Sequence, residues 1–224
     1  TNHPKTEVIL LDDAFQHRDI KAGFNIVVTD YNNPLASDYL LPAGNLRESK
    51  TGVKRADAII VSKCPSNLSN TEQQQIKKRL RFHAPQNIYF TTIQYGNIYH
   101  IFDGTPLPLL PSESTVLLVT GIGKPKPLQD YVKAQFRAVK TLTYSDHHEF
   151  SSEDIDTILT QFDKIDTPNK LILTTEKDAS RLLKIKRLKT LPLFCIEIEV
   201  DFLNKKDKFN TQIEEYVRTN KANS

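Results

Sequence analysis

Short aliphatic runs alternate with amphipathic stretches along most of the chain. The first aliphatic run covers residues 8–11 and ends in Asp12 and Asp13. Four apolar residues bounded by polar ones predict a strand buried on both faces, as in parallel sheets covered by helices. Further strands are predicted at 25–30 and 57–63. A capping-box pattern at 69–72 predicts a helix that continues to about residue 82.

The middle of the chain has a different pattern. Two β-rich runs at 88–93 and 97–102 are separated by Tyr95 and Gly96, which predicts a hairpin. A proline cluster follows, formed by Pro106, Pro108 and Pro111. Hairpin and prolines together predict a boundary between two halves of the chain.

The second half alternates strands with helices. Strands are predicted at 115–120, 139–144, 170–174 and 193–200. Helices are predicted at 127–136, 152–162, 177–183 and 205–218. This alternation is typical of βαβ units and predicts a second, mainly parallel sheet.

Composition narrows the class of protein. The chain has 224 residues, 38% of them hydrophobic and 25% charged, as expected of a globular protein with a real core. A net charge of +3 is too small to argue for nucleic acid. No apolar run approaches the roughly 18 residues of a membrane-spanning helix, so we expect any membrane contact to be peripheral. Cys64 and Cys195 lack metal-ligand spacing and are expected to be reduced.

Candidate chemistry lies at predicted strand ends. Asp12 and Asp13 follow the first strand, where nucleotide-binding proteins hold Mg²⁺, although acids also commonly cap such turns. His147 follows the strand at 139–144, and an imidazole with an ordinary pKa of about 6.5 suits a general base. The turn from Gly121 to Pro125 is similar to a phosphate-binding turn, but tight strand-to-helix turn chemistry explains it equally well.

Four stretches in order resemble one family. They are Asp-Asp-Ala-Phe-Gln-His-Arg at 12–18, Leu-Pro-Ala-Gly-Asn-Leu-Arg-Glu at 41–48, Asp-His-His-Glu-Phe at 146–150 and Thr-Thr-Glu-Lys-Asp-Ala at 174–179. The chain resembles the tetraacyldisaccharide 4'-kinase (lipid A 4'-kinase) family, with Ala14 in place of the usual Gly. The resemblance implies an α/β fold of two α/β/α sandwich lobes of P-loop-kinase type, joined by a two-stranded β linker.

The resemblance also implies domain boundaries. Residues 1–87 would be the remainder of a nucleotide-binding kinase domain, 88–112 the linker, 113–203 the second α/β domain and 204–224 a C-terminal helix. None of the seven glycines fits the phosphate-binding pattern G-x-x-x-x-G-K-[ST]. We therefore expect the chain to be the C-terminal two-thirds of a longer enzyme, and to lack kinase activity alone.

The same resemblance assigns roles to residues. The catalytic residues it implies are Asp13, Arg47 and His147, with His147 favoured over His148. Asp12 and Glu48 are expected to hold Mg²⁺. Gln16, His17, Glu176 and Lys177 are expected to contact the nucleotide, which is ATP.

Substrate and location follow from the resemblance as well. The implied reaction moves the γ-phosphate of ATP onto the 4'-hydroxyl of a tetraacyldisaccharide 1-phosphate, a lipid A precursor, at the cytoplasmic face of the bacterial inner membrane. Nucleic acid is not an expected partner. Two other interpretations stay open: a metal-dependent phosphoesterase, which would need further carboxylate and histidine ligands, and a non-catalytic nucleotide-binding module.

Overall fold

The computed structural model describes residues 8–17, 19–35, 37, 39, 43–44, 50–81, 87–108 and 111–221, and the structural statements below concern these residues. The fold is mixed α/β. The chain divides into two compact units, one formed by the residues up to Gln94 and from Val200 onward, the other by Tyr95–Glu199. The lobe, linker and domain boundaries implied by the resemblance stay predictions.

The first unit contains three parallel strands and two helices. The strands are β1 (Ile26–Asp30), β2 (Ala58–Ser62) and the first part of β3 (Asn87–His100). The helices are α1 (Asn70–Arg81) and α5 (Lys206–Lys221), and a 3-10 helix, η1, covers Lys50–Arg55. Ser69 caps α1: its hydroxyl accepts the Glu72 N–H at 3.2 Å, while the Glu72 carboxylate accepts the Ser69 N–H at 3.0 Å.

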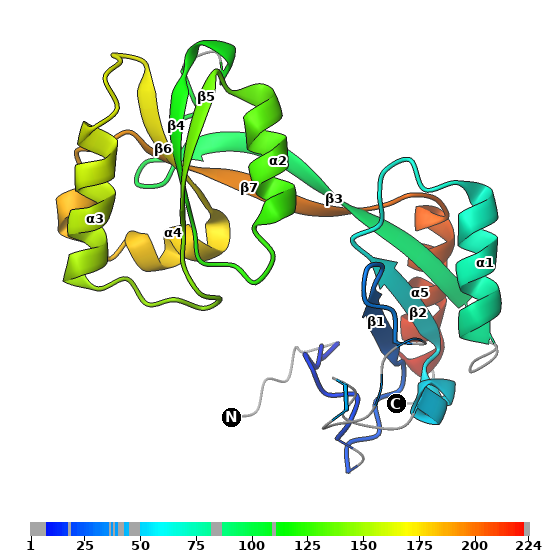
Figure 1. The fold of residues 1–224 in the computed structure, drawn as a ribbon. Coiled ribbons are helices and arrows are strands. Elements are labelled where there is room, and N and C mark those ends of the chain that lie inside the picture. Colours follow the sequence, from blue (N-terminus) through cyan, green and yellow to red (C-terminus); the bar gives the residue numbers. More distant parts are fainter. Residues whose placement is uncertain are drawn as a thin grey trace. The chain divides into compact units, whose positions relative to one another are not determined.

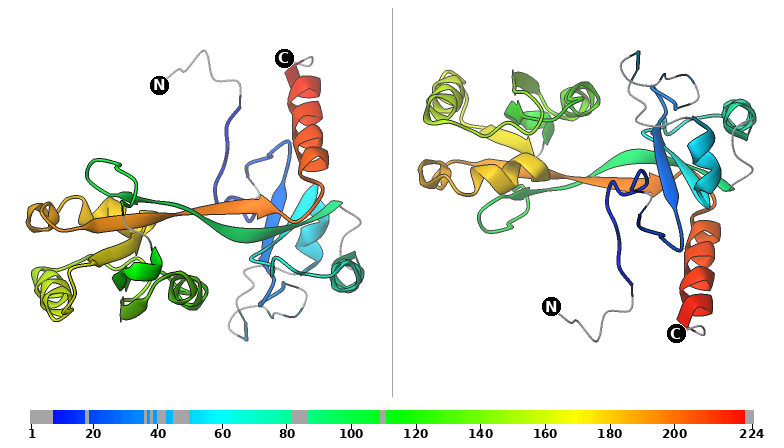
Figure 2. Two further views of the ribbon diagram at one scale, coloured as in Figure 1. Left: turned by 90° about the horizontal axis from the view of Figure 1, so that it is seen from above. Right: turned by 90° about the horizontal axis from the view of Figure 1, so that it is seen from below.

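The two helices of the first unit pack on opposite faces of its strands, as Figure 2 shows. Leu80 of α1 belongs to the same hydrophobic cluster as Ile59 of β2 and Phe90 of β3. On the other face, the Tyr89 ring lies 5.1 Å from the Phe209 ring of α5. Successive strand residues therefore point to opposite faces and bury both of them.

The second unit is a doubly covered parallel sheet. Its strands are β4 (Thr115–Thr120), β5 (Ala138–Thr143), β6 (Lys170–Thr175) and β7 (Leu193–Phe202), whose last residues lie in the first unit. Its helices are α2 (Lys126–Gln135), α3 (Ser152–Asp163) and α4 (Glu176–Leu182), with 3-10 turns η2 (Pro111–Glu113) and η3 (Lys186–Leu188). β4 pairs in parallel with β5 and β6, and β6 with β7. The hydrogen-bonded order of all seven strands is β1-β2-β3-β7-β6-β4-β5.

Alternate residues of β4 face different helices. Leu117 and Val119 pack in one cluster with Ile158 of α3. Val116 and Leu118 pack in another with α2. In Figure 1, α2 and α3 accordingly lie on opposite sides of this sheet. Burial on both faces explains why the central strands β4 and β6 have continuous aliphatic runs.

The strand predicted at 8–11 was wrong. Ile9 is 76% exposed and Leu10 is 92% exposed, and residues 8–11 have no regular secondary structure. An aliphatic run becomes a buried strand only where neighbouring strands accept its backbone hydrogen bonds and helices cover its side chains. Among the described residues, none pairs with this run in the strand ladders.

The hairpin predicted at 88–103 was also wrong. Residues 87–100 form one continuous strand, β3, which neighbours β7 in the sheet. Gly96 makes no turn; a Cβ there would meet the Glu197 carboxylate at 2.8 Å, so the glycine allows β7 to come close. Glu197 also accepts the N–H of Asn97 at 3.0 Å. The other predicted strands and helices are confirmed, with ends that differ by three residues at most.

Candidate functional site

The carboxyl ends of β4, β5 and β6 meet at one edge of the second unit's sheet. Because the three strands are parallel neighbours, the segments that follow them lie together. These segments are the turn that starts at Gly121, the loop 144–150 and the first turn of α4. All three contain residues singled out from the sequence.

Two glycines let these segments approach one another. A Cβ on Gly121 would lie 3.1 Å from an Asp178 carboxylate oxygen and 3.3 Å from the Ser145 carbonyl oxygen. A Cβ on Gly123 would lie 3.1 Å from an Asp146 carboxylate oxygen. The glycines therefore allow close packing of the turn. This agrees with the explanation from tight strand-to-helix turn chemistry.

Asp178 of α4 connects this helix to the turn at Gly121 through buried hydrogen bonds. Its side chain is fully buried, and one carboxylate oxygen accepts the N–H of Gly121 at 3.0 Å and the hydroxyl of Thr175 at 2.8 Å. The other oxygen pairs with the guanidinium of Arg181. A buried carboxylate with three donors around it is compensated for its lost hydration.

Asp146, His147 and Lys177 form a polar group that we call the Asp146 cluster. The ammonium of Lys177 lies 2.9 Å from Asp146 Oδ1 and 3.2 Å from His147 Nε2. Asp146 Oδ1 also accepts the backbone N–H of His147 at 3.0 Å. The hydrogen bond from Lys177 is the main reason why the pKa of Asp146 is lowered from 3.8.

His148 faces the protein. Its Nε2 lies 2.8 Å from Asp154 Oδ2, and its ring stacks on Tyr144 at 4.7 Å between centroids. Burial opposes ionisation of Asp154, but hydrogen bonds from Ser151 and His148 lower its pKa overall. The side chain of His148 is 25% exposed and that of His147 is 75% exposed. Of the two, His147 is thus the one placed to meet a ligand.

The acids at residues 12 and 13 belong to the first unit and are both exposed. Asp13 has a left-handed backbone with φ of 47°, which turns the chain directly after Asp12. Gln16 donates to Asp13 Oδ1 at 3.3 Å. His17 is exposed, and its N–H donates to the Ala14 carbonyl at 2.9 Å, closing this turn.

The remaining sequence-predicted residues divide into two groups. Glu176 is occupied by structural contacts: it accepts the Tyr99 hydroxyl at 2.8 Å and the Ile198 N–H at 3.4 Å. Its role toward a nucleotide stays a prediction. Arg47 and Glu48 lie outside the described residues.

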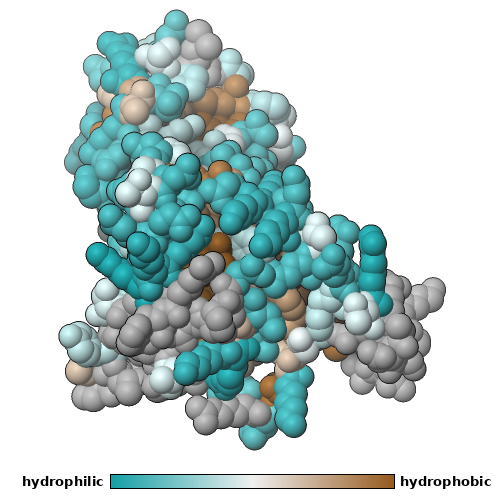
Figure 3. Space-filling model, turned by 90° about the vertical axis from the view of Figure 1, so that its right-hand side faces the viewer, coloured by the Kyte–Doolittle hydropathy of each residue, from teal (hydrophilic) through white to brown (hydrophobic). Residues whose placement is uncertain are grey.

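Cation ligands are not gathered in the part of the chain that the structure describes: no three His, Cys, Asp or Glu side chains there could hold a metal ion together. Within the same ranges, no helix is both long and apolar enough to cross a membrane. On the face drawn in Figure 3, the described residues are mainly hydrophilic and the hydrophobic ones show only as small patches.

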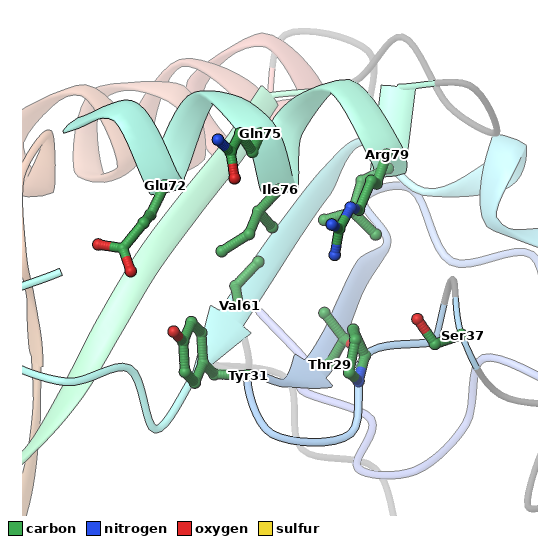
Figure 4. Close-up of a pocket in the computed structure, with 10 residues that line it drawn as sticks. Thr29, Tyr31, Ser37, Val61, Glu72, Gln75, Ile76 and Arg79 are labelled. Atoms are coloured by element: carbon green, nitrogen blue, oxygen red, sulfur yellow. The ribbon is translucent and has the colours of Figure 1, made fainter. Parts of the chain in front are cut away.

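A pocket that the sequence did not predict lies in the first unit. It has a volume of about 280 Å³ and is bounded by α1 and by the carboxyl ends of β1 and β2. Figure 4 shows Glu72 and Arg79 projecting from α1 toward Tyr31 and Thr29. The helical periodicity of the sequence could have indicated that residues 72, 76 and 79 lie together, since these positions share one face of a helix.

Known proteins are similar to almost the whole chain. A family model described as tetraacyldisaccharide-1-P 4'-kinase (LpxK) matches residues 1–218. The chain belongs to the tetraacyldisaccharide-1-P 4'-kinase family. A family relative, the tetraacyldisaccharide 4'-kinase of Bacteroides thetaiotaomicron, is 43% identical; the alignment covers 99% of this chain and 62% of that protein. The corresponding protein of Bacteroides fragilis is 42% identical, over 98% of this chain and 61% of its own length.

A solved structure agrees on the fold. It is an "apo" form LpxK from Aquifex aeolicus in complex with ATP, similar with a TM-score of 0.60 and 20% identity, over 92% of this chain and 56% of that one. At 20% sequence identity, this similarity supports a shared fold and nothing beyond it. The chain thus spans about three-fifths of the length of the curated family members that it matches.

Proposed function

We propose that this protein is an ATP-dependent lipid A 4'-kinase, which phosphorylates the 4'-hydroxyl of a tetraacyldisaccharide 1-phosphate. The observation that carries the proposal is the family match over residues 1–218. Two of the four ordered motifs support it, because residues 12–17 and 146–150 lie outside the helices and strands of the structure. Loops that combine several polar groups usually serve binding or catalysis.

The proposed chemistry asks little covalent work of the protein. Phosphoryl transfer needs positioned charges around the moving phosphate and a group that manages the proton of the attacking hydroxyl. Asp13 and His147 are proposed as catalytic residues, and Arg47 would pair with phosphate oxygens through its planar guanidinium. His147 and Asp13 both have exposed side chains, as residues that meet a substrate require.

The carboxylate of Asp12 is the type of ligand that Mg²⁺ prefers. Mg²⁺ is commonly held by one or two carboxylates together with substrate phosphates, so an exposed carboxylate suits it without a complete protein cage. Asp12 would provide this ligand, and Glu48 the second. When bound, the ion would neutralise charge on the phosphates. Gln16, His17, Glu176 and Lys177 are proposed to face the nucleotide, which is ATP.

The acceptor implies a membrane surface. A tetraacylated disaccharide keeps its acyl chains in a bilayer, so the enzyme would work on the cytoplasmic face of the bacterial inner membrane as a peripheral protein. We propose this location from the chemistry of the acceptor.

A fusion protein tests the function. The part of the Bacteroides thetaiotaomicron relative without a counterpart here is joined to the N-terminus of this chain, and transfer of ³²P from ATP to the disaccharide is measured. We expect transfer by the fusion and none by the chain alone. His147→Ala in the fusion should lower kcat by about 10²-fold or more. Lys133→Ala, on the exposed surface of α2, is the control and should change nothing.

Two outcomes would contradict the proposal. One is a folded fusion that binds ATP and transfers no phosphate. The other is Mn²⁺-stimulated hydrolysis of a phosphodiester without ATP, which would assign the chain to the phosphoesterases instead. Transfer by the chain alone would refute only the expectation that the chain is inactive by itself.

A further inference from the structure

Besides the nucleotide contact proposed for it, Lys177 contacts two neighbouring residues in this structure. Its ammonium lies 2.9 Å from Asp146 Oδ1 and 3.2 Å from His147 Nε2. We propose that Lys177 is a positioning residue that holds His147 as a neutral imidazole protonated on Nδ1, so that His147 works as a hydrogen-bond donor through Nδ1–H. The tautomer is argued from the geometry alone; only the participation of His147 in the reaction rests on the proposed function.

Counting protons leads to this tautomer. A lysine ammonium has three N–H donors and no acceptor. At 3.2 Å from it, Nε2 of His147 must therefore be the acceptor and carry no proton. The single proton of the neutral ring then lies on Nδ1, the reverse of the tautomer that a histidine side chain prefers in water.

The opposite assignment is less favourable. A proton on Nε2 would point toward Asp146 Oδ2, but that oxygen is 4.0 Å away, beyond hydrogen-bond distance. The same proton would face the Lys177 ammonium at 3.2 Å and leave two donors opposed. The ammonium would then have to leave Asp146, to which it is held at 2.9 Å.

The backbone of His147 is fixed by the same carboxylate. His147 has a left-handed conformation with φ of 59°, which costs a non-glycine residue about 1 kcal/mol or more. Asp146 Oδ1 accepts its N–H at 3.0 Å and so offsets part of that cost. Gly123 leaves room for the Asp146 side chain, since a Cβ there would lie 3.1 Å from its Oδ2. Ring and backbone of His147 are therefore both set by the pair that Lys177 forms with Asp146.

The consequence concerns the role of His147. With Nε2 turned to Lys177, the ring offers a donor and no acceptor to a ligand. His147 would then bind and orient an acceptor group, while the proton of the sugar hydroxyl is taken up elsewhere. This role replaces the general base considered from the sequence.

Histidine ¹⁵N chemical shifts test the inference directly. The 224-residue chain is labelled with ¹⁵N and its six histidines are observed by two-bond ¹H–¹⁵N correlation, with His147→Gln to assign the signal. The measurement is made at about pH 8, above the ordinary imidazole pKa of about 6.5. We expect His147 to show a protonated Nδ1, and His148, whose Nε2 faces Asp154, to show a protonated Nε2.

Three variants make the test specific. Lys177→Met should shift His147 toward the Nε2–H form, whereas Lys177→Arg keeps a donor and should retain Nδ1–H. Lys126→Met is the matched control, because Lys126 pairs with Asp130 at 3.1 Å on the surface of α2 and should leave His147 unchanged. The inference is overturned if wild-type His147 carries its proton on Nε2, or if Lys177→Met leaves the tautomer unaltered. No nucleotide or acceptor is used, so a failed kinase assay would not produce either result.

Discussion

Two adjacent histidines illustrate how neighbouring residues acquire different tasks. His148 stacks on Tyr144 and donates to Asp154, so its ring is part of the packing of α3. His147 turns outward on a left-handed backbone and contacts Lys177. Both histidines belong to the same Asp-His-His motif. The direction in which each side chain points decides which of them can reach a ligand.

The Asp146 carboxylate gives a pH-dependent prediction at this scale. Its pKa lies below 3.8 in the folded chain, first because Lys177 donates to it. A lowered pKa means that its stabilising effect is present above the unfolded value and is lost as pH falls through the folded value. In Lys177→Met we expect the pKa of Asp146 to rise toward 3.8, measured by ¹³C NMR of the carboxyl group. An unchanged pKa in the variant, or an equal rise in Lys126→Met, would refute the assignment.

At the scale of elements, strand-to-helix turns assemble the candidate site. β4, β5 and β6 end side by side: β4 leads into the turn at Gly121, β5 into the loop 144–150, and β6 directly into α4. Thr175 caps α4 by accepting the Asp178 N–H at 3.1 Å, and Ser151 caps α3 in a capping box with Asp154. The caps fix where each helix starts, and so help to place His147 in the loop before α3 and Lys177 in the first turn of α4.

Gly121 tests how tightly these turns are packed. In Gly121→Ala the new methyl group would lie 3.1 Å from Asp178, 3.3 Å from the His148 Cβ and 3.3 Å from the Ser145 carbonyl. Because the last of these is backbone, the loop itself would have to move. We expect a loss of about 1–3 kcal/mol in the free energy of unfolding, measured with urea. Lys133→Ala should stay within about 0.5 kcal/mol, and a Gly121→Ala variant as stable as wild type would mean that the turn is loose.

At the scale of the whole molecule, the chain has two compact units with separate hydrophobic clusters. In the first unit, Tyr89, Phe202 and Phe209 pack together, with the Phe202 and Phe209 rings 5.0 Å apart. In the second, Phe162 is buried in the cluster under α3. A substitution in the hydrophobic core of one unit should therefore destabilise mainly that unit.

Reciprocal core variants test this independence by hydrogen exchange. Phe209→Ala removes a half-buried ring, should cost about 2 kcal/mol, and should speed exchange in β2. Phe162→Ala removes a buried ring, should cost about 3–5 kcal/mol, and should speed exchange in β4 and β6. Equal acceleration in both units from either variant would show one cooperative core instead of two.

The sequence by itself determined most elements of the fold. The continuous aliphatic runs predicted β4 and β6 correctly, because the central strands of a sheet covered on both faces are buried along almost their whole length. Helix caps such as Ser69 and Ser151 marked helix starts because they satisfy backbone groups locally. The motifs also indicated the family, since the order of short polar stretches is a property of the chain alone.

Tertiary structure decided the rest. Residues 8–11 have the pattern of a buried strand, yet strand formation depends on partners, which a local pattern cannot supply. Gly96 marks close approach by β7 and not a turn, and only the strand from a hundred residues later reveals it. Lys177 reaches Asp146 across 31 positions of sequence. Local hydrogen bonds and side-chain periodicity can be read along the chain, whereas contacts between distant segments exist only once the chain has folded.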